Sequence, residues 1–332
     1  MKIYYLLISL ILLITVSCDK KEPDSNIKDP FCTNDSRFTE SDFFSDLEID
    51  SLTNIVYGNA IDWEGNDTEL LIDAYFPDSE MDELSNRPAV MLIHGGGYQS
   101  GHKEDWADEC FEFAKKGFVA FTIKYRLGWD DNEPIDQFRA SYRANQDARA
   151  ALRFIVDNAD QYGVNTDWIF IGGGSAGAVS ALDIVYITQD EWNAFFPGIE
   201  AALGNLDTSG NNLNNTYSIK GVFNNWGGTI EDYMQPEEML PMISFHGELD
   251  TTVPIDSGMQ GFIGSRAISN TLEDNGICFD LTVEPDGEHG IYLNPLGTIF
   301  RVGRASCFFK SMMCDNCNNF YAEEVIEANC SN

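Results

Sequence analysis

The chain has few basic residues. Its 332 residues include 20 Lys and Arg against 54 Asp and Glu, which gives a net charge of −34 at pH 7. A surface of this sign repels nucleic acids and anionic membranes. The basic patch that phosphate binding would require is missing from the sequence. We therefore expect neither nucleic acid nor a membrane surface as a partner, and interpret the acidity as a feature that favours solubility.

The amino terminus lacks an apolar run long enough to span a membrane. The run Ile3–Val16 has 14 residues, whereas a spanning helix needs about 20. It follows Met1 and Lys2, and a basic start before a short apolar run is typical of an export signal. We predict an export signal over residues 1–18 that is removed or serves as a temporary anchor.

The end of this signal resembles that of a bacterial lipoprotein. Ser17 precedes Cys18 and the charged run 19–22 follows it, although Thr15 stands where an aliphatic residue is usual. The resemblance implies lipid attachment at Cys18 and a place at the cell envelope or outer surface. Otherwise Cys18 lies at an ordinary cleavage site, and the protein is periplasmic or secreted.

The next segment lacks the apolar periodicity of a folded region. Residues 19–37 are rich in Asp, Lys, Pro and Ser, and such a segment cannot bury enough surface to fold. We predict a flexible linker there. Residues 38–332 contain no internal repeat and suit one large α/β domain.

The cysteines gather near the carboxyl terminus. Besides Cys18 there are seven, and four of them lie in the segment 307–330. In an exported protein this clustering favours disulfides that pin the terminal segment, with one thiol left free. The pairings stay open. A zinc site at Cys314 and Cys317 is the alternative, but no histidine or second closely spaced pair completes a set of four ligands.

Short apolar runs alternate with longer amphipathic ones from residue 88 onward, which predicts a mostly parallel central sheet with helices on both faces. Residues 55–57 and 69–76 predict an antiparallel edge. The predicted buried strands cover 89–93, 119–124, 168–172, 221–225, 242–245 and 280–284. The predicted helices cover 105–116, 135–158, 176–187, 259–275 and 296–313.

One connection is long. Residues 188–218 lie between two predicted strands and carry Trp192, Phe195 and Phe196 in their first half. Long insertions of this kind are often lids. The alternative is an ordinary helix and loop that packs these aromatic side chains into the core.

A G-x-S-x-G motif at residues 173–177 follows a predicted strand and precedes a predicted helix. This is the strand-turn-helix setting in which the motif holds a nucleophile, here Ser175, on a sharp turn. The helix would direct its first amides toward the place where negative charge develops. Gly-rich turns after strands also bind nucleotide phosphates, so the motif alone does not decide the chemistry.

A second glycine-rich loop begins at His94 and continues through Gly95, Gly96 and Gly97, directly after the predicted strand 89–93. Consecutive glycines leave backbone N–H groups uncovered, so they can point at a substrate oxygen. With the amide of Ala176 they would form an oxyanion hole. The alternative is a flexible loop at the end of a strand.

Only four histidines occur, and His289 alone follows the last predicted buried strand. Imidazole titrates near neutral pH, so His289 is the favoured base for the Ser175 hydroxyl. Asp250 follows the penultimate strand and would orient that imidazole. Other acids remain candidates for this role: Glu248, Asp256 and Asp286.

The order Ser, Asp, His and these motifs are similar to those of α/β-hydrolase-fold carboxylesterases, near the hormone-sensitive-lipase-like and polysaccharide-deacetylating esterases. The resemblance covers residues 89–290 and includes an H-G-x-x-D-x-x-V-P stretch that begins at His246. It implies the α/β-hydrolase fold and a Ser175, Asp250 and His289 triad. It also implies an oxyanion hole from Gly96, Gly97 and Ala176, with His94 and Gly95 supporting the loop.

The resemblance implies hydrolysis of carboxylic esters through an acyl-enzyme, without a metal or organic cofactor. Export and the predicted tether favour short acyl esters, such as acetyl groups on a polysaccharide. Two departures, the cysteine-rich tail and Tyr98 where many relatives carry tryptophan, leave the substrate open. The alternatives are a serine peptidase of the same fold and a binding module without catalysis.

Overall fold

The computed structural model describes residues 30–32, 34–82, 84–133, 135–258, 261–323 and 330. The predicted export signal, with Cys18, and most of the predicted linker lie outside these residues. In the part of the chain described, no helix combines the length and the apolar character needed to cross a bilayer.

A nine-stranded sheet forms the centre of the molecule, in the order β1-β2-β4-β3-β5-β6-β8-β10-β11. Strands β1 and β2 are antiparallel to their neighbours, and all other neighbouring pairs are parallel. The prediction of a mostly parallel sheet with an antiparallel edge is therefore confirmed. The strands of this sheet are β1 (Ile49–Ile61), β2 (Asp67–Pro77), β3 (Arg87–Ile93), β4 (Val119–Ile123), β5 (Val164–Gly174), β6 (Ile219–Asn225), β8 (Met242–Gly247), β10 (Phe279–Glu284) and β11 (Phe320–Glu323). Strands β7 (Gly228–Ile230) and β9 (Phe262–Gly264) form a separate two-stranded sheet.

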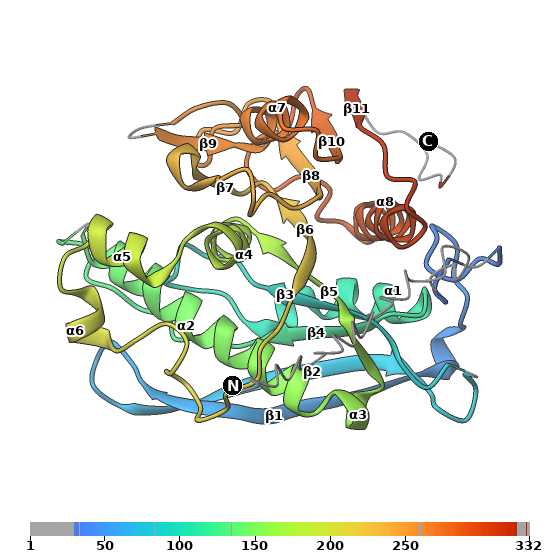
Figure 1. Cartoon of the computed structure of the whole chain (residues 1–332), viewed down its shortest axis with the longest axis horizontal. Helices are drawn as coiled ribbons and strands as arrows, with labels where there is room; N and C mark the ends of the chain where they lie inside the picture. Colours follow the sequence, from blue (N-terminus) through green and yellow to red (C-terminus); the bar gives the residue numbers. More distant parts are fainter. Residues whose placement is uncertain are drawn as a thin grey trace, which may run out of the picture.

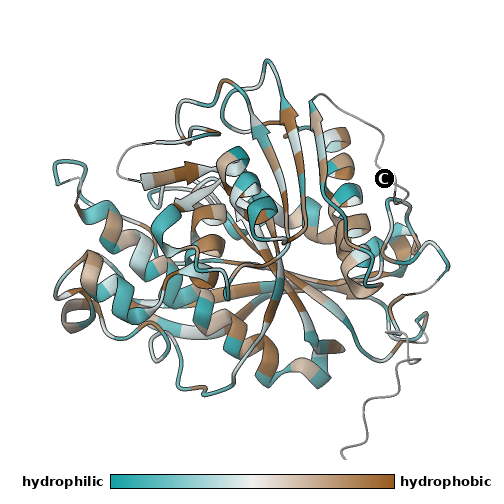
Figure 2. Cartoon of the chain, turned by 45° about the horizontal axis from the view of Figure 1, so that its top comes forward, coloured by the Kyte–Doolittle hydropathy of each residue, from teal (hydrophilic) through white to brown (hydrophobic). Residues whose placement is uncertain are grey.

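Helices cover both faces of the sheet, and the strands fan out between them with the twist expected of a parallel sheet (Figures 1 and 2). The helices are α1 (Ala107–Lys115), α2 (Asp136–Asp157), α3 (Ala159–Tyr162), α4 (Ala176–Tyr186), α5 (Gln189–Phe195), α6 (Ile199–Leu203), α7 (Ser265–Asp274) and α8 (Pro295–Met313), with three short 3-10 helices at Asp46–Glu48, Lys103–Trp106 and Glu231–Tyr233.

Alternate residues of each central strand point to opposite faces, which divides the core into two apolar clusters. In β3, Met91 and Ile93 join the cluster beneath α2 and α4, whereas Val90 and Leu92 join the cluster beneath α1 and α8. All four are fully buried. A strand buried on both faces explains why this segment is a continuous apolar run in the sequence.

The folded domain begins earlier than predicted. Phe31 is 1% exposed and packs edge to face on Phe38, with ring centroids 5.7 Å apart. Arg37 donates two hydrogen bonds to the buried Asp82 carboxylate, at 2.8 and 2.9 Å. The predicted boundary at residue 37 was therefore wrong, because a buried aromatic ring and a buried ion pair fix this segment to the domain.

One predicted helix was partly wrong. Residues 259–275 were expected to be helical, but α7 begins at Ser265, and Phe262–Gly264 forms the short strand β9. Strand β9 pairs with β7 in a small antiparallel sheet. This pairing depends on a segment more than thirty positions away, so a local pattern did not reveal it.

Three disulfides pin the carboxyl-terminal segment: Cys32–Cys314, Cys278–Cys317 and Cys307–Cys330. The remaining described cysteine, Cys110, is free and buried. The prediction of disulfides with one free thiol is confirmed. The zinc alternative is wrong, because Cys314 and Cys317 are bonded to different partners and have no thiolate to offer.

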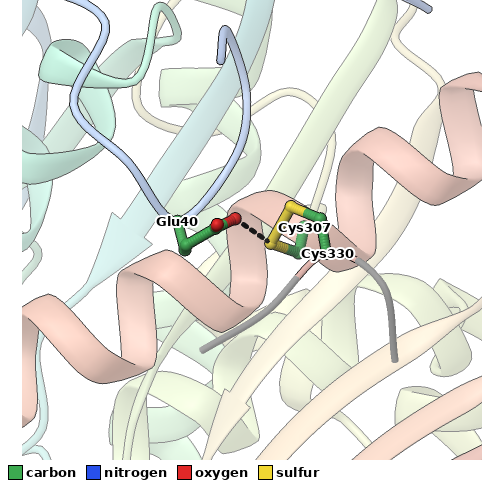
Figure 3. A group of neighbouring side chains, drawn as sticks. All are labelled: Glu40, Cys307 and Cys330. Carbon is green, nitrogen blue, oxygen red and sulfur yellow. Dashed lines mark hydrogen bonds between the residues drawn. A yellow bond between two sulfur atoms is a disulfide. The ribbon is translucent and has the colours of Figure 1, made fainter. Parts of the chain in front are cut away.

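The pair Cys307–Cys330 lies beside Glu40, whose Oε2 atom is 3.2 Å from the Cys307 Sγ atom (Figure 3). The two sulfurs and the carboxylate are close enough together to surround a metal ion. Both sulfurs are already oxidised to the disulfide, so Glu40 alone retains a strong ligand atom there. The amino-terminal segment is instead linked to α8 by Lys310, which donates hydrogen bonds to the carbonyl oxygens of Asp35 and Arg37 at 2.9 Å.

Candidate active site

The turn between β5 and α4 holds Ser175 in a strained backbone conformation. Its φ and ψ are 54° and −126°, and positive φ is costly for a residue with a side chain. Two glycines make the turn compact: a Cβ atom on Gly173 or Gly177 would lie 2.2 or 2.0 Å from the carbonyl oxygen of Ile93. The strain presents the Ser175 hydroxyl at the carboxyl end of β5 and directly before the first turn of α4.

The loop after β3 lies against this turn. A Cβ atom on Gly95 would meet the Cβ atom of Ser175 at 3.1 Å, so the loop and the serine are in direct contact. Gly96 and Gly97 have φ values of 104° and 60°. Within the described residues, no hydrogen bond uses the amide N–H of Gly96, Gly97 or Ala176. These donors are thus available to an oxygen held beside Ser175.

His94 supports the loop. Its ring is buried and stacks on Tyr125 with centroids 4.2 Å apart, and its Nδ1 atom lies 2.8 Å from the Gly95 carbonyl oxygen. Burial lowers the pKa of His94, which favours the neutral ring. Trp129 donates a hydrogen bond to the Gly97 carbonyl oxygen at 3.0 Å and holds the other end of the loop.

His289 lies between Ser175 and Asp250. Its Nε2 atom is 2.8 Å from the Ser175 Oγ atom, and its Nδ1 atom is 2.7 Å from the Asp250 Oδ2 atom. Both distances are those of hydrogen bonds. The structure thus brings together three residues that the sequence places on separate loops, in the arrangement in which a histidine can remove a proton from a serine.

The surroundings of Asp250 keep it ionised. Burial raises its pKa, but hydrogen bonds from His246, the Val253 amide and His289 outweigh that effect and lower the pKa to about 2. Its Oδ1 atom accepts the amides of Thr252 and Val253 at 2.8 and 2.9 Å. The Oδ2 atom is left to face the imidazole of His289.

His246 contacts the Asp250 loop, which was not predicted from the sequence. Its Nε2 atom lies 2.8 Å from the Val253 carbonyl oxygen and 3.3 Å from the Asp250 Oδ2 atom. Because both partners are acceptors, this nitrogen carries a proton. Its Nδ1 atom lies 2.6 Å from the Ser265 hydroxyl. His246 therefore holds the Asp250 loop in place; its position within the H-G-x-x-D stretch was the only signal in the sequence.

The rival acids lie elsewhere. Glu248 and Asp256 both pair with Arg266, and Asp286 is exposed to solvent. Of the other histidines, His102 is exposed at the start of a 3-10 helix. None of these residues reaches the imidazole of His289 by a hydrogen bond within the described part of the chain.

Two pockets meet at Ser175. The first, which we call the inner pocket, has a volume of about 280 Å³ and includes Ala176 but not His289. The second, the outer pocket, is more open, has a volume of about 720 Å³ and includes His289. Ser175, Gly97 and Thr252 line both. The two pockets therefore provide space on both sides of the serine hydroxyl.

The segment 188–218 forms one wall of the inner pocket. Trp192 and Phe195 from α5 line it, and Trp192 also packs edge to face on Tyr142 at 5.3 Å. Farther along, the Asn211 side chain donates hydrogen bonds to the carbonyl oxygens of Tyr57 and Ala150. In this structure the segment is both packed into the core and part of the pocket, so features of both interpretations from the sequence are present.

Parts of the chain are similar to known proteins. A sequence model of the BD-FAE family matches residues 72–231. Rat carboxylesterase 1C is 34% identical over 117 residues, which cover 35% of this chain and 21% of that protein. The chain spans only 15–21% of the length of the first curated relatives that it matches.

Two solved structures share the fold. An esterase of the planctomycete Thermogutta terrifontis, with propionate bound, has a TM-score of 0.59 at 21% identity, over 79% of this chain and 94% of that one. An α/β hydrolase, MGS-M1, from a Medee basin deep-sea metagenome has a TM-score of 0.53 at 21% identity, over 81% of this chain and 99% of that one. The chain therefore has the α/β-hydrolase fold, as predicted.

Proposed function

We propose that this protein hydrolyses carboxylic esters through an acyl-enzyme formed on Ser175. The observation that carries the proposal is the continuous hydrogen-bonded chain from Ser175 through His289 to Asp250, with distances of 2.8 and 2.7 Å. The likeness of residues 72–231 to the BD-FAE family and the partial match to carboxylesterases support it.

The first half of the reaction forms the acyl-enzyme. His289 Nε2 removes the Ser175 proton as Oγ attacks the ester carbonyl carbon, and the ionised Asp250 stabilises the imidazolium. The amides of Gly97 and Ala176, with that of Gly96, donate to the oxyanion; a single donor of this kind is typically worth ~10²–10³ in rate. His289 then gives its proton to the departing alcohol oxygen. In the second half, His289 takes a proton from a water that attacks the acyl carbonyl carbon, and returns this proton to the Ser175 Oγ atom as the acid leaves.

The position of His289 supports a placement of the alcohol and acyl parts of the ester in the two pockets. The alcohol oxygen must lie within reach of the imidazole that protonates it, and His289 lines only the outer pocket. The alcohol thus occupies the outer pocket and the acyl group the inner pocket. Because the outer pocket is open and the larger of the two, it has room for a bulky alcohol such as a sugar unit.

The limited volume of the inner pocket favours short acyl groups. A pocket of about 280 Å³ cannot enclose a long fatty acyl chain. The Thermogutta esterase has been solved with propionate and with butyrate bound, which supports the same range. With the predicted export signal and lipid attachment at Cys18, we propose polysaccharide esters outside the cytoplasm as the setting.

The test is hydrolysis of nitrophenyl esters from acetate to palmitate, together with acetylated xylan. We expect the highest kcat/KM on the short chains, release of acetate from the xylan, and loss of both activities in Ser175→Ala. Best activity on palmitate would contradict the acyl range. Cleavage that persists in Ser175→Ala would contradict the mechanism.

A further inference from the structure

The inner pocket contains a buried carboxylate that the proposed mechanism does not use. Asp183 lies on α4, the helix that begins directly after Ser175, and is only 5% exposed. It lines the inner pocket together with Tyr98 and Ser141. We infer that Asp183 determines the specificity of the enzyme, because it accepts a hydrogen bond from a hydroxyl group at the far end of the acyl chain. This inference rests on the proposed function.

The hydrogen bonds of Asp183 are incomplete. Its Oδ2 atom accepts bonds from Ser141 Oγ at 3.2 Å and Asn145 Nδ2 at 3.3 Å. Within the described residues, no hydrogen bond uses the Oδ1 atom and no ion pair involves this carboxylate. Oδ1 is not fully covered by protein atoms, and Asp183 lines the inner pocket, so a ligand in the pocket can reach this acceptor.

The hydroxyl groups of Ser141, Tyr98 and Ser180 form a row of close contacts that begins at this carboxylate. Tyr98, which replaces the tryptophan expected from the family resemblance, is buried with its hydroxyl 3.2 Å from Ser141 Oγ. Ser180 Oγ lies 3.5 Å from the same tyrosine oxygen. The lining of the inner pocket thus includes a small polar group, Tyr98, Ser141 and Asp183, and the buried Ser180 lies next to Tyr98.

The other residues that line the inner pocket determine which donor group of a substrate can bind to Asp183. Most are apolar or aromatic, as the side chains of Phe138, Val179, Ile187, Trp192 and Phe195 show. An ammonium group would bring a full charge and three donors into this apolar space, where burial of a charge without several partners is unfavourable. A hydroxyl group has one donor, which matches the single free carboxylate oxygen, and can accept a bond from a neighbouring hydroxyl. The donor that fits this pocket is therefore an uncharged hydroxyl group.

The position of Asp183 sets the distance of that hydroxyl from the ester. From Ala176 to Asp183 the helix rises by about 10 Å, at about 1.5 Å per residue. Side chains on a helix tilt toward its amino terminus, which shortens the gap to Ser175. An acetyl group cannot cross this distance, so acetyl esters would be cleaved without this contact. A substrate that uses the contact carries its hydroxyl several bonds away from the carbonyl carbon.

The experiment compares three nitrophenyl esters that differ only at the last acyl carbon: hexanoate, ω-hydroxyhexanoate and ω-aminohexanoate. At about pH 8.5, where Asp183 with its pKa of about 7 is ionised, we expect kcat/KM of the natural chain for the hydroxy ester to exceed that for hexanoate by roughly 10- to 100-fold, the worth of one hydrogen bond to a charged group. Asp183→Leu should reduce this ratio to about 1 while hexanoate is still cleaved. Asp183→Asn keeps an acceptor oxygen, so its ratio should lie between that of the natural chain and that of Asp183→Leu. Asp190→Asn, an exposed acid on α5, should keep the natural ratio.

Equal rates on hexanoate and hydroxyhexanoate in the natural chain would overturn the inference, as would an unchanged preference in the Asp183 variants. A preference for the amino ester would overturn the choice of hydroxyl. Failure of the proposed function is a separate result, because none of the three esters would then be cleaved in a Ser175-dependent way. Thermal melting shows whether Asp183→Leu folds. If it does not, the ratio of hydroxyhexanoate to hexanoate cleavage in the natural chain and in Asp183→Asn still tests the inference.

Discussion

The Nε2 atom of His289 lies 2.8 Å from the Oγ atom of Ser175, although 114 positions separate the two residues in the chain. The first follows β10 and the second follows β5, so the contact exists because parallel strands end at the same edge of one sheet. The hydrogen bond joins the two groups that the proposed reaction requires to exchange a proton.

Asp250 should matter for activity far more than a nearby acid. Asp250→Asn keeps the shape of the side chain but loses the negative charge that stabilises the imidazolium, so we expect kcat to fall by about 10⁴. Asp256→Asn is the matched control, because Asp256 is exposed and pairs with Arg266. Steady-state hydrolysis of a nitrophenyl ester measures both variants. Similar losses in the two would argue against a special role for Asp250.

The compact turn around Ser175 should not tolerate a methyl group at Gly177. Gly177→Ala would bring a Cβ atom to 2.0 Å from the Ile93 carbonyl oxygen, so α4 or β3 must shift. We expect a loss of at least tenfold in kcat/KM and a lower melting temperature, since overpacking typically costs about 1–3 kcal/mol. Gly258→Ala is the control: the atom nearest to its new Cβ would be 3.6 Å away, so kcat/KM and the melting temperature should both stay unchanged. Natural activity in Gly177→Ala would contradict the geometry of the turn.

The buried Asp183 should make stability depend on pH. Burial raises its pKa from 3.8 to about 7, against the smaller lowering effect of hydrogen bonds from Asn145 and Ser141. Because the folded chain holds this proton more tightly than the unfolded chain, the contribution to stability is fully present below the unfolded pKa. It is lost as the pH rises through about 7. A difference of three pKa units corresponds to about 4 kcal/mol.

Asp183→Asn removes this titration. Relative to the natural chain, the variant should therefore gain stability between pH 5 and pH 8, as thermal melting at several pH values would show. Each kcal/mol corresponds to roughly 1–2 °C in melting temperature for a domain of about 300 residues. Asp190→Asn should show no such trend, since that side chain is exposed. A constant difference across the pH range would mean that Asp183 does not titrate as described.

The disulfide Cys32–Cys314 joins segments that are 282 positions apart and should stabilise the domain without shaping the site. Replacing both cysteines with serine should cost about 2–5 kcal/mol of unfolding free energy. Neither cysteine lines the inner or the outer pocket, so kcat/KM at 25 °C should stay within about twofold. Denaturant unfolding and ester hydrolysis on the same sample measure the two effects. Loss of activity in a folded variant would contradict this separation.

The central strands could be predicted because their signal is local. Residues 89–93 form a continuous apolar run, and the structure buries them on both faces in β3. Ser175, Asp250 and His289 could be singled out for a related reason. Each lies in a short segment of glycine, proline or acidic residues directly after a predicted strand, and the ends of parallel strands gather at one edge.

The features that could not be predicted depend on contacts between segments that are distant in the chain. Phe262–Gly264 forms a strand only because β7 lies beside it, and β11 depends on the disulfide-linked tail pairing with β10. Asp183 is the one charged residue of an otherwise apolar helix, α4, and a helix that is apolar on all sides is typically buried. The sequence does not show that Ser141 and Asn145 of α2 contact this carboxylate or that it lines a pocket, because α2 is distant in the chain.

The most direct test of the account is covalent labelling with a fluorophosphonate probe, which reacts with a serine only when a base activates it. The natural chain and the control Ser218→Ala, which changes an exposed serine, should label to the same extent. Ser175→Ala and His289→Ala should not label, and peptide mass analysis should find the probe on Ser175. Equal labelling of Ser175→Ala and the natural chain would contradict the claim that Ser175 is the activated nucleophile.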